Sequence, residues 1–393
     1  MKVVHVSGDF PDTIASFKTP VIKTLVDLTN QDFAHEVFSI NRSPTGAFGL
    51  SVATLRGNGW PRLTVSSEPF EYGLAISYNA PGRGIFHKSM LDQLGRALAN
   101  HVISRGEKPD LIIGHKLTIE GLIVSAMSKA LGVPYALSIQ GDTDTKILQV
   151  RRDLKGTFRK IWREARVIFP FSPWSYEAIR SSLGEPGGSV VMLPCATDLD
   201  EPMRPVAKGD GLVSVFHLKN WRRKNLNGIA QAVRTMSVNG NAPTVSIIGG
   251  GDAKERDACK AIIGDVPGIT LVGAVNHPHL KTRMNAATAF ILPSRRESFG
   301  MVFIEALFAG LPIIYPKGTA VDGYFDNAPF ALSVDANSPA SIASAMQDTI
   351  DNEKSLKRTL AEWQCSADAK RFTRAEIGKT FAKSISGALG GKS

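Results

Sequence analysis

Two carboxylates, Glu297 and Glu305, lie on either side of the start of an apolar stretch. Residues 301–309 are otherwise apolar, which predicts a buried helix opened by Gly300. Glu305 would then lie about a turn and a half inside this helix. A carboxylate in such surroundings needs a partner, and the residues alone leave open whether that partner is a protein cation or a ligand hydroxyl.

A basic segment, His217-Leu-Lys-Asn-Trp-Arg-Arg-Lys-Asn225, stands at a predicted strand-to-helix junction. Its cations could hold a diphosphate beside a cleft, and the alternative is a solvated basic loop. Glycine-bearing turns follow other predicted strands: Ser7-Gly-Asp9, Gly249-Gly-Gly-Asp252 and the turn before Gly300. Glycine lets backbone amides approach a phosphate, although a tight turn can require glycine for its own sake. None of these turns matches Gly-x-Gly-x-x-Gly or the Walker pattern.

The elements that must position these residues alternate between short apolar strands and helices along the chain. A breaker-rich segment at residues 198–211 separates two such series, and an aromatic and Gly/Pro-rich run at residues 42–87 interrupts the first as a functional loop or a hairpin insertion. The alternation predicts parallel sheets covered on both faces. We therefore expect two Rossmann-like doubly wound α/β domains that face a central cleft, residues 1–200 and 201–371, with a C-terminal helix at about 372–393 that packs back on the first.

Composition and charge restrict the class of protein. The chain of 393 residues carries a net charge of +10, and its three cysteines form no Cys-x-x-Cys pair, so we expect a cytoplasmic protein without a zinc site. No signal peptide or membrane span is expected. The basic charge is spread over many segments, which argues against a nucleic-acid module. Its densest cluster, Arg151–Arg166, predicts a basic amphipathic helix that either packs its apolar stripe on the core or attaches peripherally to the anionic inner face of a membrane.

A longer pattern surrounds the two glutamates. The stretch Pro293-Ser-Arg-Arg-Glu-Ser-Phe-Gly-Met-Val-Phe-Ile-Glu-Ala-Leu-Phe-Ala-Gly-Leu-Pro312 resembles the signature of retaining glycosyltransferase family four. Other segments resemble family motifs in the same order: Leu193-Pro-Cys-Ala-Thr-Asp198, Lys224-Asn-Leu-Asn-Gly-Ile-Ala-Gln-Ala232, Ile247-Ile-Gly-Gly-Gly251 and Val272-Gly-Ala-Val275. The resemblance implies the B-type glycosyltransferase fold, with a nucleotide-diphosphate sugar, UDP- or GDP-linked, bound to the second domain as donor substrate. It implies no cofactor and no metal.

The resemblance also implies roles for individual residues. Glu305 would bind the ribose, Glu297 the sugar, and Lys224 together with the amides of Gly300 and Met301 the diphosphate, whose new charge they would stabilise without a metal. The remaining donor-binding candidates are Ser298, Phe299, Val302, Gly249, Gly250, Ala274, Val275, Arg223 and Gly8.

Two departures from the family pattern affect the expected chemistry. Gln140-Gly141 stands where the family often has His-Gly, and His217 stands where it usually has Arg. We expect His115, Asp142 or Asp9, at predicted strand ends facing the same cleft, to substitute for the missing histidine, and His217, Arg222 or Arg223 for the arginine. The predicted activity is that of a retaining, metal-independent hexosyltransferase-type enzyme acting on a sugar or lipid-linked acceptor, as in cell-envelope polysaccharide, lipopolysaccharide or glycolipid synthesis. The alternatives are a nucleotide-sugar epimerase of the same fold and an inactive nucleotide-sugar-binding protein.

Overall fold

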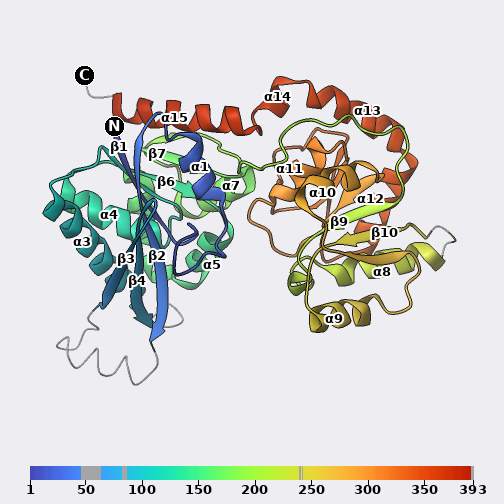
Figure 1. The fold of residues 1–393 in the computed structure, drawn as a ribbon, viewed down its shortest axis with the longest axis horizontal. Coiled ribbons are helices and arrows are strands. Elements are labelled where there is room, and N and C mark those ends of the chain that lie inside the picture. The colour runs from blue at the N-terminus through green and yellow to red at the C-terminus, as the bar shows by residue number, and fades with distance from the viewer. Residues whose placement is uncertain (46–62, 82–85, 239, 241, 391–393) are drawn as a thin grey trace. The chain divides into compact units, whose positions relative to one another are not determined.

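The chain folds into two compact units of alternating strands and helices (Figure 1). The computed structural model describes residues 1–393 apart from 46–62, 82–85, 239, 241 and 391–393. Unit 1 comprises Met1–Phe171, Ser175–Leu193 and Ile377–Ser393, and unit 2 comprises Ser172–Trp174 and Pro194–Glu376.

Unit 1 is built on an eight-stranded sheet in the order β3-β4-β2-β1-β5-β6-β7-β8. The strands are β1 (Lys2–Ser7), β2 (Ala34–Thr45), β3 (Val65–Phe70), β4 (Gly73–Pro81), β5 (Leu111–Gly114), β6 (Tyr135–Ile139), β7 (Val167–Pro170) and β8 (Ser189–Val190). Every residue of β5, β6 and β7 is buried, because helices cover both faces of the sheet. The helices are α1 (Val21–Leu28), α3 (His87–Arg105), α4 (Glu120–Leu131), α5 (Asp142–Val150), α6 (Lys155–Glu164), α7 (Pro173–Leu183) and α15 (Arg374–Gly390).

The predicted interruption at residues 42–87 forms, in its described part, an edge of this sheet. β3 pairs antiparallel with β4, which corrects the expectation of a wholly parallel sheet. Only residues 71 and 72 separate the two strands, and such a short connection permits antiparallel pairing alone. Gly73 opens β4 at φ 147°, where a Cβ atom would lie 2.4 Å from the carbonyl oxygen of Val37. Trp60, one of the aromatic residues of this run, lies outside the described residues.

Unit 2 has a six-stranded parallel sheet in the order β11-β10-β9-β12-β13-β14. Its strands are β9 (Leu212–Val215), β10 (Val245–Ile248), β11 (Ile269–Gly273), β12 (Ala289–Ile291), β13 (Ile313–Pro316) and β14 (Ala331–Val334). Its helices are α8 (Leu226–Val238), α9 (Ala253–Ile263), α10 (His277–Asn285), α11 (Met301–Phe308), α12 (Pro339–Asp351), α13 (Glu353–Gln364) and α14 (Ala367–Lys370). Two doubly wound α/β domains are therefore confirmed as the fold class.

The last helix, α15, returns to unit 1 after the chain has built unit 2 (Figure 1). Its buried residues include Ile377, Phe381 and Ile385, and the ring of Phe381 lies 5.1 Å from that of Phe169 in an edge-to-face arrangement. Burial of these apolar side chains attaches the helix to the unit from which the chain began.

Each sheet has a point where the strand order reverses. In unit 1, β1 lies between β2 and β5, and in unit 2, β9 lies between β10 and β12. In open α/β sheets the loops at such a point diverge to opposite faces, and ligands bind in the crevice between them at the carboxyl ends of the strands. No helix in the described part of the chain is long and apolar enough to cross a membrane.

Candidate functional site

In unit 2 the loops after β9 and β12 bring Lys224 and Glu297 together at the point where the strand order reverses. Their side chains form an ion pair, and each exposes 12% of its surface. The backbone of Glu297 is held in place by Thr319, whose Oγ1 accepts a hydrogen bond of 3.2 Å from the Glu297 amide and donates one to the Glu297 carbonyl. The ion pair is thus mostly buried, and Thr319 fixes the backbone position of its carboxylate residue.

Asn225, which was not among the predicted site residues, links the two loops by hydrogen bonds. It adopts φ 60° before α8 begins and is almost fully buried. Its amide nitrogen donates to the carbonyls of Pro293 at 3.0 Å and Ala336 at 2.7 Å, and its Oδ1 accepts from Arg295 Nε at 3.2 Å. Asparagine tolerates this left-handed conformation better than most residues do. Asn225 therefore fixes the position of Lys224 beside the loop that carries Glu297.

Glu305 lies inside α11, and its Oε1 accepts a hydrogen bond of 2.6 Å from Thr197 Oγ1. Gly300 precedes the helix at φ 75°, where a Cβ atom would lie 2.7 Å from the ring of Phe303. The amides of Met301 and Val302 belong to the first turn, whose N–H groups have no partner within the helix. The helix predicted after Gly300 is therefore present, with Glu297 before it and Glu305 inside it.

In the triple-glycine turn after β10, close packing against the chain after β9 requires a glycine at position 249. A Cβ atom at Gly249 would lie 1.8 Å from the carbonyl oxygen of Phe216, so the chain after β10 contacts the chain after β9 directly. Gly250 is less constrained, with 3.6 Å between its hypothetical Cβ and that of Ala274. The Gly250 carbonyl accepts from the Leu218 amide at 2.8 Å. A structural requirement for glycine is therefore established at Gly249.

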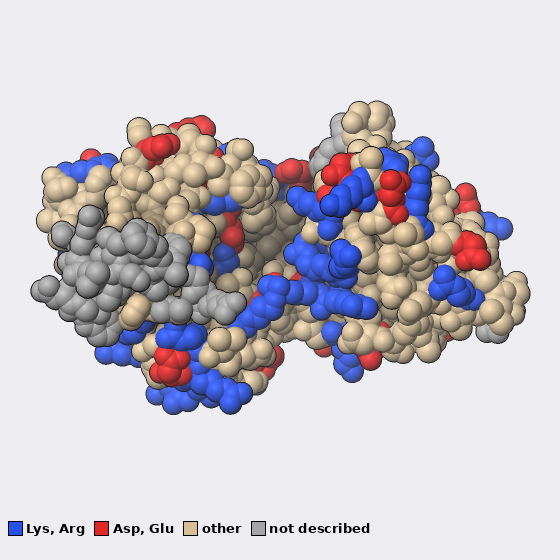
Figure 2. All heavy atoms as spheres, turned by 90° about the horizontal axis from the view of Figure 1, so that it is seen from below, with Lys and Arg blue, Asp and Glu red and all other residues tan. Residues whose placement is uncertain are grey.

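The other donor-site candidates of unit 2 differ in their exposure to solvent. His217 is exposed, and its Nδ1 accepts a hydrogen bond of 3.2 Å from the Lys219 amide. Arg223 is exposed, Ala274 is exposed and Val275 is half-buried. Ser298 is half-buried while Phe299 is buried. Figure 2 shows that Lys and Arg side chains gather in groups on the face viewed there, so anions approaching this face meet positive charge.

In unit 1 a second polar cluster occupies the crevice after β1 and β5. Lys116 Nζ lies 2.5 Å from Asp9 Oδ2 and 3.8 Å from Glu120 Oε1, and the same Glu120 oxygen accepts 2.8 Å from the Gly8 amide. Gly8, which was predicted to contact the donor, is thus engaged by a carboxylate of its own unit. Lys116 and Glu120 were not selected from the sequence, since isolated polar residues after a strand give no periodic signal.

The charges in this cluster are set by burial and by one another. Burial, the largest effect, raises the pKa of Glu120 to about 7, although Lys116 acts to lower it. Burial acts to lower the pKa of Lys116, but Glu120 and Asp9 outweigh it and raise that pKa above its usual value. Burial acts to raise the pKa of Asp9, and Lys116 lowers it overall. At neutral pH the crevice therefore presents an ammonium group paired with the Asp9 carboxylate.

His115, predicted to face a cleft, is fully buried. Its ring nitrogens lie 3.0 Å from His5 Nδ1 and 3.1 Å from Ser138 Oγ, and burial lowers its pKa to about 3. The ring is therefore a neutral member of an internal chain of hydrogen bonds. Gln140 donates from Nε2 to the His115 carbonyl at 3.0 Å. Asp142 opens α5 and exposes 17% of its side chain, at 3.9 Å from Lys146.

Among the described residues, no group of three or more His, Cys, Asp and Glu side chains is arranged to hold a metal ion. The loops after β9 and β12 in unit 2 supply the Lys224–Glu297 pair, and the helix start at Gly300 and Glu305 follow along the same segment.

Known proteins with similar sequences are glycosyltransferases. Residues 206–362 match the family model described as glycosyl transferases group 1. A glycosyltransferase of Methanocaldococcus jannaschii, MJ1178, is 22% identical over 320 residues, which are 76% of this chain and 81% of that protein. A Bacillus subtilis protein, TuaC, named as a teichuronic acid biosynthesis glycosyltransferase, is 22% identical over 244 residues, 59% of each chain.

A solved structure supports the fold independently. The α,α-trehalose-phosphate synthase (UDP-forming) of Burkholderia xenovorans, in complex with glucose-6-phosphate, superposes with a TM-score of 0.65 at 10% identity, over 98% of this chain and 99% of that chain. Residues 206–362 therefore resemble the group 1 glycosyl transferases, and the chain has the B-type glycosyltransferase fold.

Proposed function

We propose that this protein is a glycosyltransferase that moves a sugar from a nucleotide-diphosphate donor to an acceptor hydroxyl, with retention at the anomeric carbon and without a metal. The observation that carries the proposal is the Lys224–Glu297 ion pair at the strand-order reversal of unit 2, beside the Gly300 helix start. The family model covers this segment, and the resemblance of residues 293–312 to the retaining family supports retention.

The donor chemistry follows from charge. When the bond between sugar and phosphate breaks, the leaving nucleoside diphosphate gains negative charge. Lys224 and the first-turn amides of α11 would stabilise that charge, because an ammonium and a helix N-terminus both favour an anion. Once Lys224 pairs with the diphosphate, the Glu297 carboxylate would be free to accept hydrogen bonds from the sugar hydroxyls and orient them. Glu305 would accept hydrogen bonds from the ribose hydroxyls, while Thr197 Oγ1 keeps its hydrogen bond to Glu305 Oε1.

We assign the acceptor to the crevice of unit 1. Its Asp9–Lys116 pair offers both an acceptor and a donor of hydrogen bonds, which suits a polyhydroxylated ligand. The UDP-forming neighbour supports a uridine donor over GDP, and the teichuronic acid relative supports a cell-envelope polysaccharide as product.

The test combines binding and turnover. Glu305→Ala should weaken uridine diphosphate binding in calorimetry and abolish release of the diphosphate from a UDP-sugar in the presence of acceptor. The control is Glu362→Ala, which removes an exposed carboxylate of α13. Nuclear magnetic resonance of the product should show the donor's anomeric configuration. Wild-type turnover by Glu305→Ala would refute the donor site, and an inverted product would refute retention.

A second candidate, a nucleotide-sugar-binding protein without transferase activity, is favoured by one observation. Gln140 stands where the resembled family often has a histidine, and its amide is engaged by the backbone of His115. Tight diphosphate binding by the wild type, with no turnover against a broad panel of acceptors, would favour this candidate over the transferase.

A further inference from the structure

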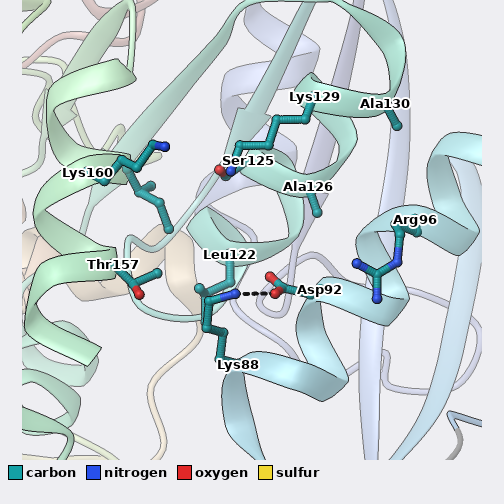
Figure 3. Close-up of a pocket in the computed structure, with 11 residues that line it drawn as sticks. Lys88, Asp92, Arg96, Leu122, Ser125, Ala126, Lys129, Ala130, Thr157 and Lys160 are labelled. Atoms are coloured by element: carbon teal, nitrogen blue, oxygen red, sulfur yellow. Dashed lines mark hydrogen bonds and ion pairs between the residues drawn. The ribbon is translucent and has the colours of Figure 1, made fainter. Parts of the chain in front are cut away.

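A hollow on unit 1 lies among α3, α4 and α6, apart from the crevice described above (Figure 3). Its volume is about 450 Å³. Figure 3 shows the side chains of Lys88, Arg96, Lys129 and Lys160 arranged around it, contributed by all three helices. Three separate elements therefore direct cations to one place.

The cations of this hollow outnumber the carboxylates. Asp92 lines the hollow and is paired with Lys88, while Lys160 lies 3.6 Å from Glu164. Arg96 and Lys129 make no ion pair with any described residue, and both are exposed. Like charges held near one another repel, so an anion between them would lower the free energy of the folded unit.

The base of the hollow has a different character. Leu122 and Ile161 line it and are almost fully buried, while Ser125 and Thr157 add hydroxyl groups. A phosphate group accepts hydrogen bonds from hydroxyls and charge-assisted ones from lysine and arginine. The lining thus fits a phosphate that carries an apolar or glycerol-like portion.

The same surface continues along α6. Phe158, Ile161 and Trp162 are buried in unit 1, which decides the question left open for the basic amphipathic segment: its apolar stripe packs on the core and is not available for insertion into a bilayer. The outward positions of α6 carry exposed cations, Lys155, Arg159, Lys160 and Arg163. Any contact of this helix with a membrane must therefore be electrostatic.

We propose that the hollow binds the phosphate headgroup of an anionic phospholipid and so attaches unit 1 to a membrane surface. Charge complementarity carries the choice of occupant, since four cations line the hollow and one of them, Lys160, also belongs to the row of exposed cations on α6. The proposal goes beyond sugar transfer and does not depend on it. Binding should weaken steeply as salt rises, because attraction between the exposed cations and the anionic surface is its main contribution.

The test is sedimentation with vesicles. The full chain should bind vesicles of phosphatidylcholine mixed with phosphatidylglycerol, and not vesicles of phosphatidylcholine alone. Arg96→Gln combined with Lys129→Gln should weaken that binding by about 30-fold, since each cation near an anionic surface contributes roughly 5-fold. The matched control, Lys254→Gln with Lys260→Gln, removes two exposed cations from α9 of unit 2 and should retain binding.

Three outcomes decide the proposal. Loss of vesicle binding in the Arg96/Lys129 variant alone, with wild-type diphosphate binding in unit 2, would support it. Equal vesicle binding by the variant and the wild type would overturn it. Thermal stabilisation by inorganic phosphate that depends on Arg96 and Lys129, without vesicle binding, would also overturn it and would assign the hollow to a soluble anion.

Discussion

Lys224→Met and Glu297→Gln should change nucleoside diphosphate binding in opposite directions. The two side chains are paired with each other, so a diphosphate that binds Lys224 must take it away from Glu297. Removing the lysine deletes a contact that the ligand needs. Removing the charge on the glutamate deletes a competitor for that contact and a source of repulsion.

The magnitudes follow from the geometry. A hydrogen bond to a charged group contributes about 1.5–3 kcal/mol, so Lys224→Met should weaken binding by about 10- to 150-fold. A carboxylate at roughly 6 Å from a phosphate charge repels it by about 0.7–2.8 kcal/mol for effective dielectric constants between 80 and 20. Glu297→Gln should therefore tighten binding by at least about 3-fold, while sugar transfer is lost.

Isothermal calorimetry with uridine diphosphate measures both effects. The control is Lys219→Met, which removes an exposed charge five residues away along the same loop and should change affinity by less than about 2-fold if contact rather than general charge decides. Weaker binding by Glu297→Gln than by the wild type would refute the reasoning, because the carboxylate would then be a direct ligand of the diphosphate.

Two further predictions concern unit 1. Burial lowers the pKa of His115 to about 3 and holds that of His5 well below its usual value. Below about pH 6.5 the unfolded chain therefore binds protons at these rings that the native state does not bind. The free energy of unfolding should fall on acidification by about 1.4 kcal/mol per pH unit for each ring. Urea titrations from neutral pH to about pH 5 should show this slope, and His5→Gln with His115→Gln should flatten it; an unchanged slope would assign it to other groups. Phe381→Ala should destabilise unit 1 by about 3–5 kcal/mol, since the ring is fully buried against Phe169. Limited proteolysis should then cut unit 1 at lower temperature while diphosphate binding by unit 2 persists, and an unchanged cleavage temperature would contradict the packing described for α15.

The proximity of Lys224 and Glu297 could be predicted because it depends on the order of the strands along the chain. Lys224 and Glu297 each follow a strand, and the two strands, β9 and β12, are neighbours in the sheet. Parallel strands end at the same edge, so residues that follow neighbouring strands come together although 73 positions separate them. The contact between Thr197 and Glu305 had no such signal, because it joins a segment without regular structure to the middle of a helix.

The crevice of unit 1 was predicted less well. His115 was correctly seen to follow a strand, but which side of the sheet its ring occupies depends on the pleat and on neighbours such as His5, which the sequence does not order in space. Glu120 begins a helix whose other buried residues are mostly apolar, and its contact with Gly8 spans 112 positions. Burial of a lone carboxylate has no pattern that periodicity can detect.

The return of α15 to unit 1 sets an order of events during synthesis. On the ribosome, residues 1–193 emerge early, yet the surface around Phe169 stays uncovered until the chain has been translated beyond Ile385. Unit 2 is synthesised before that point, so the apolar surface of unit 1 that α15 later covers stays exposed, and chaperones or other chains could bind it. A ribosome that stops after unit 2 would release a protein with a complete unit 2 and an uncovered apolar face on unit 1, which quality-control proteases would recognise as exposed apolar surface.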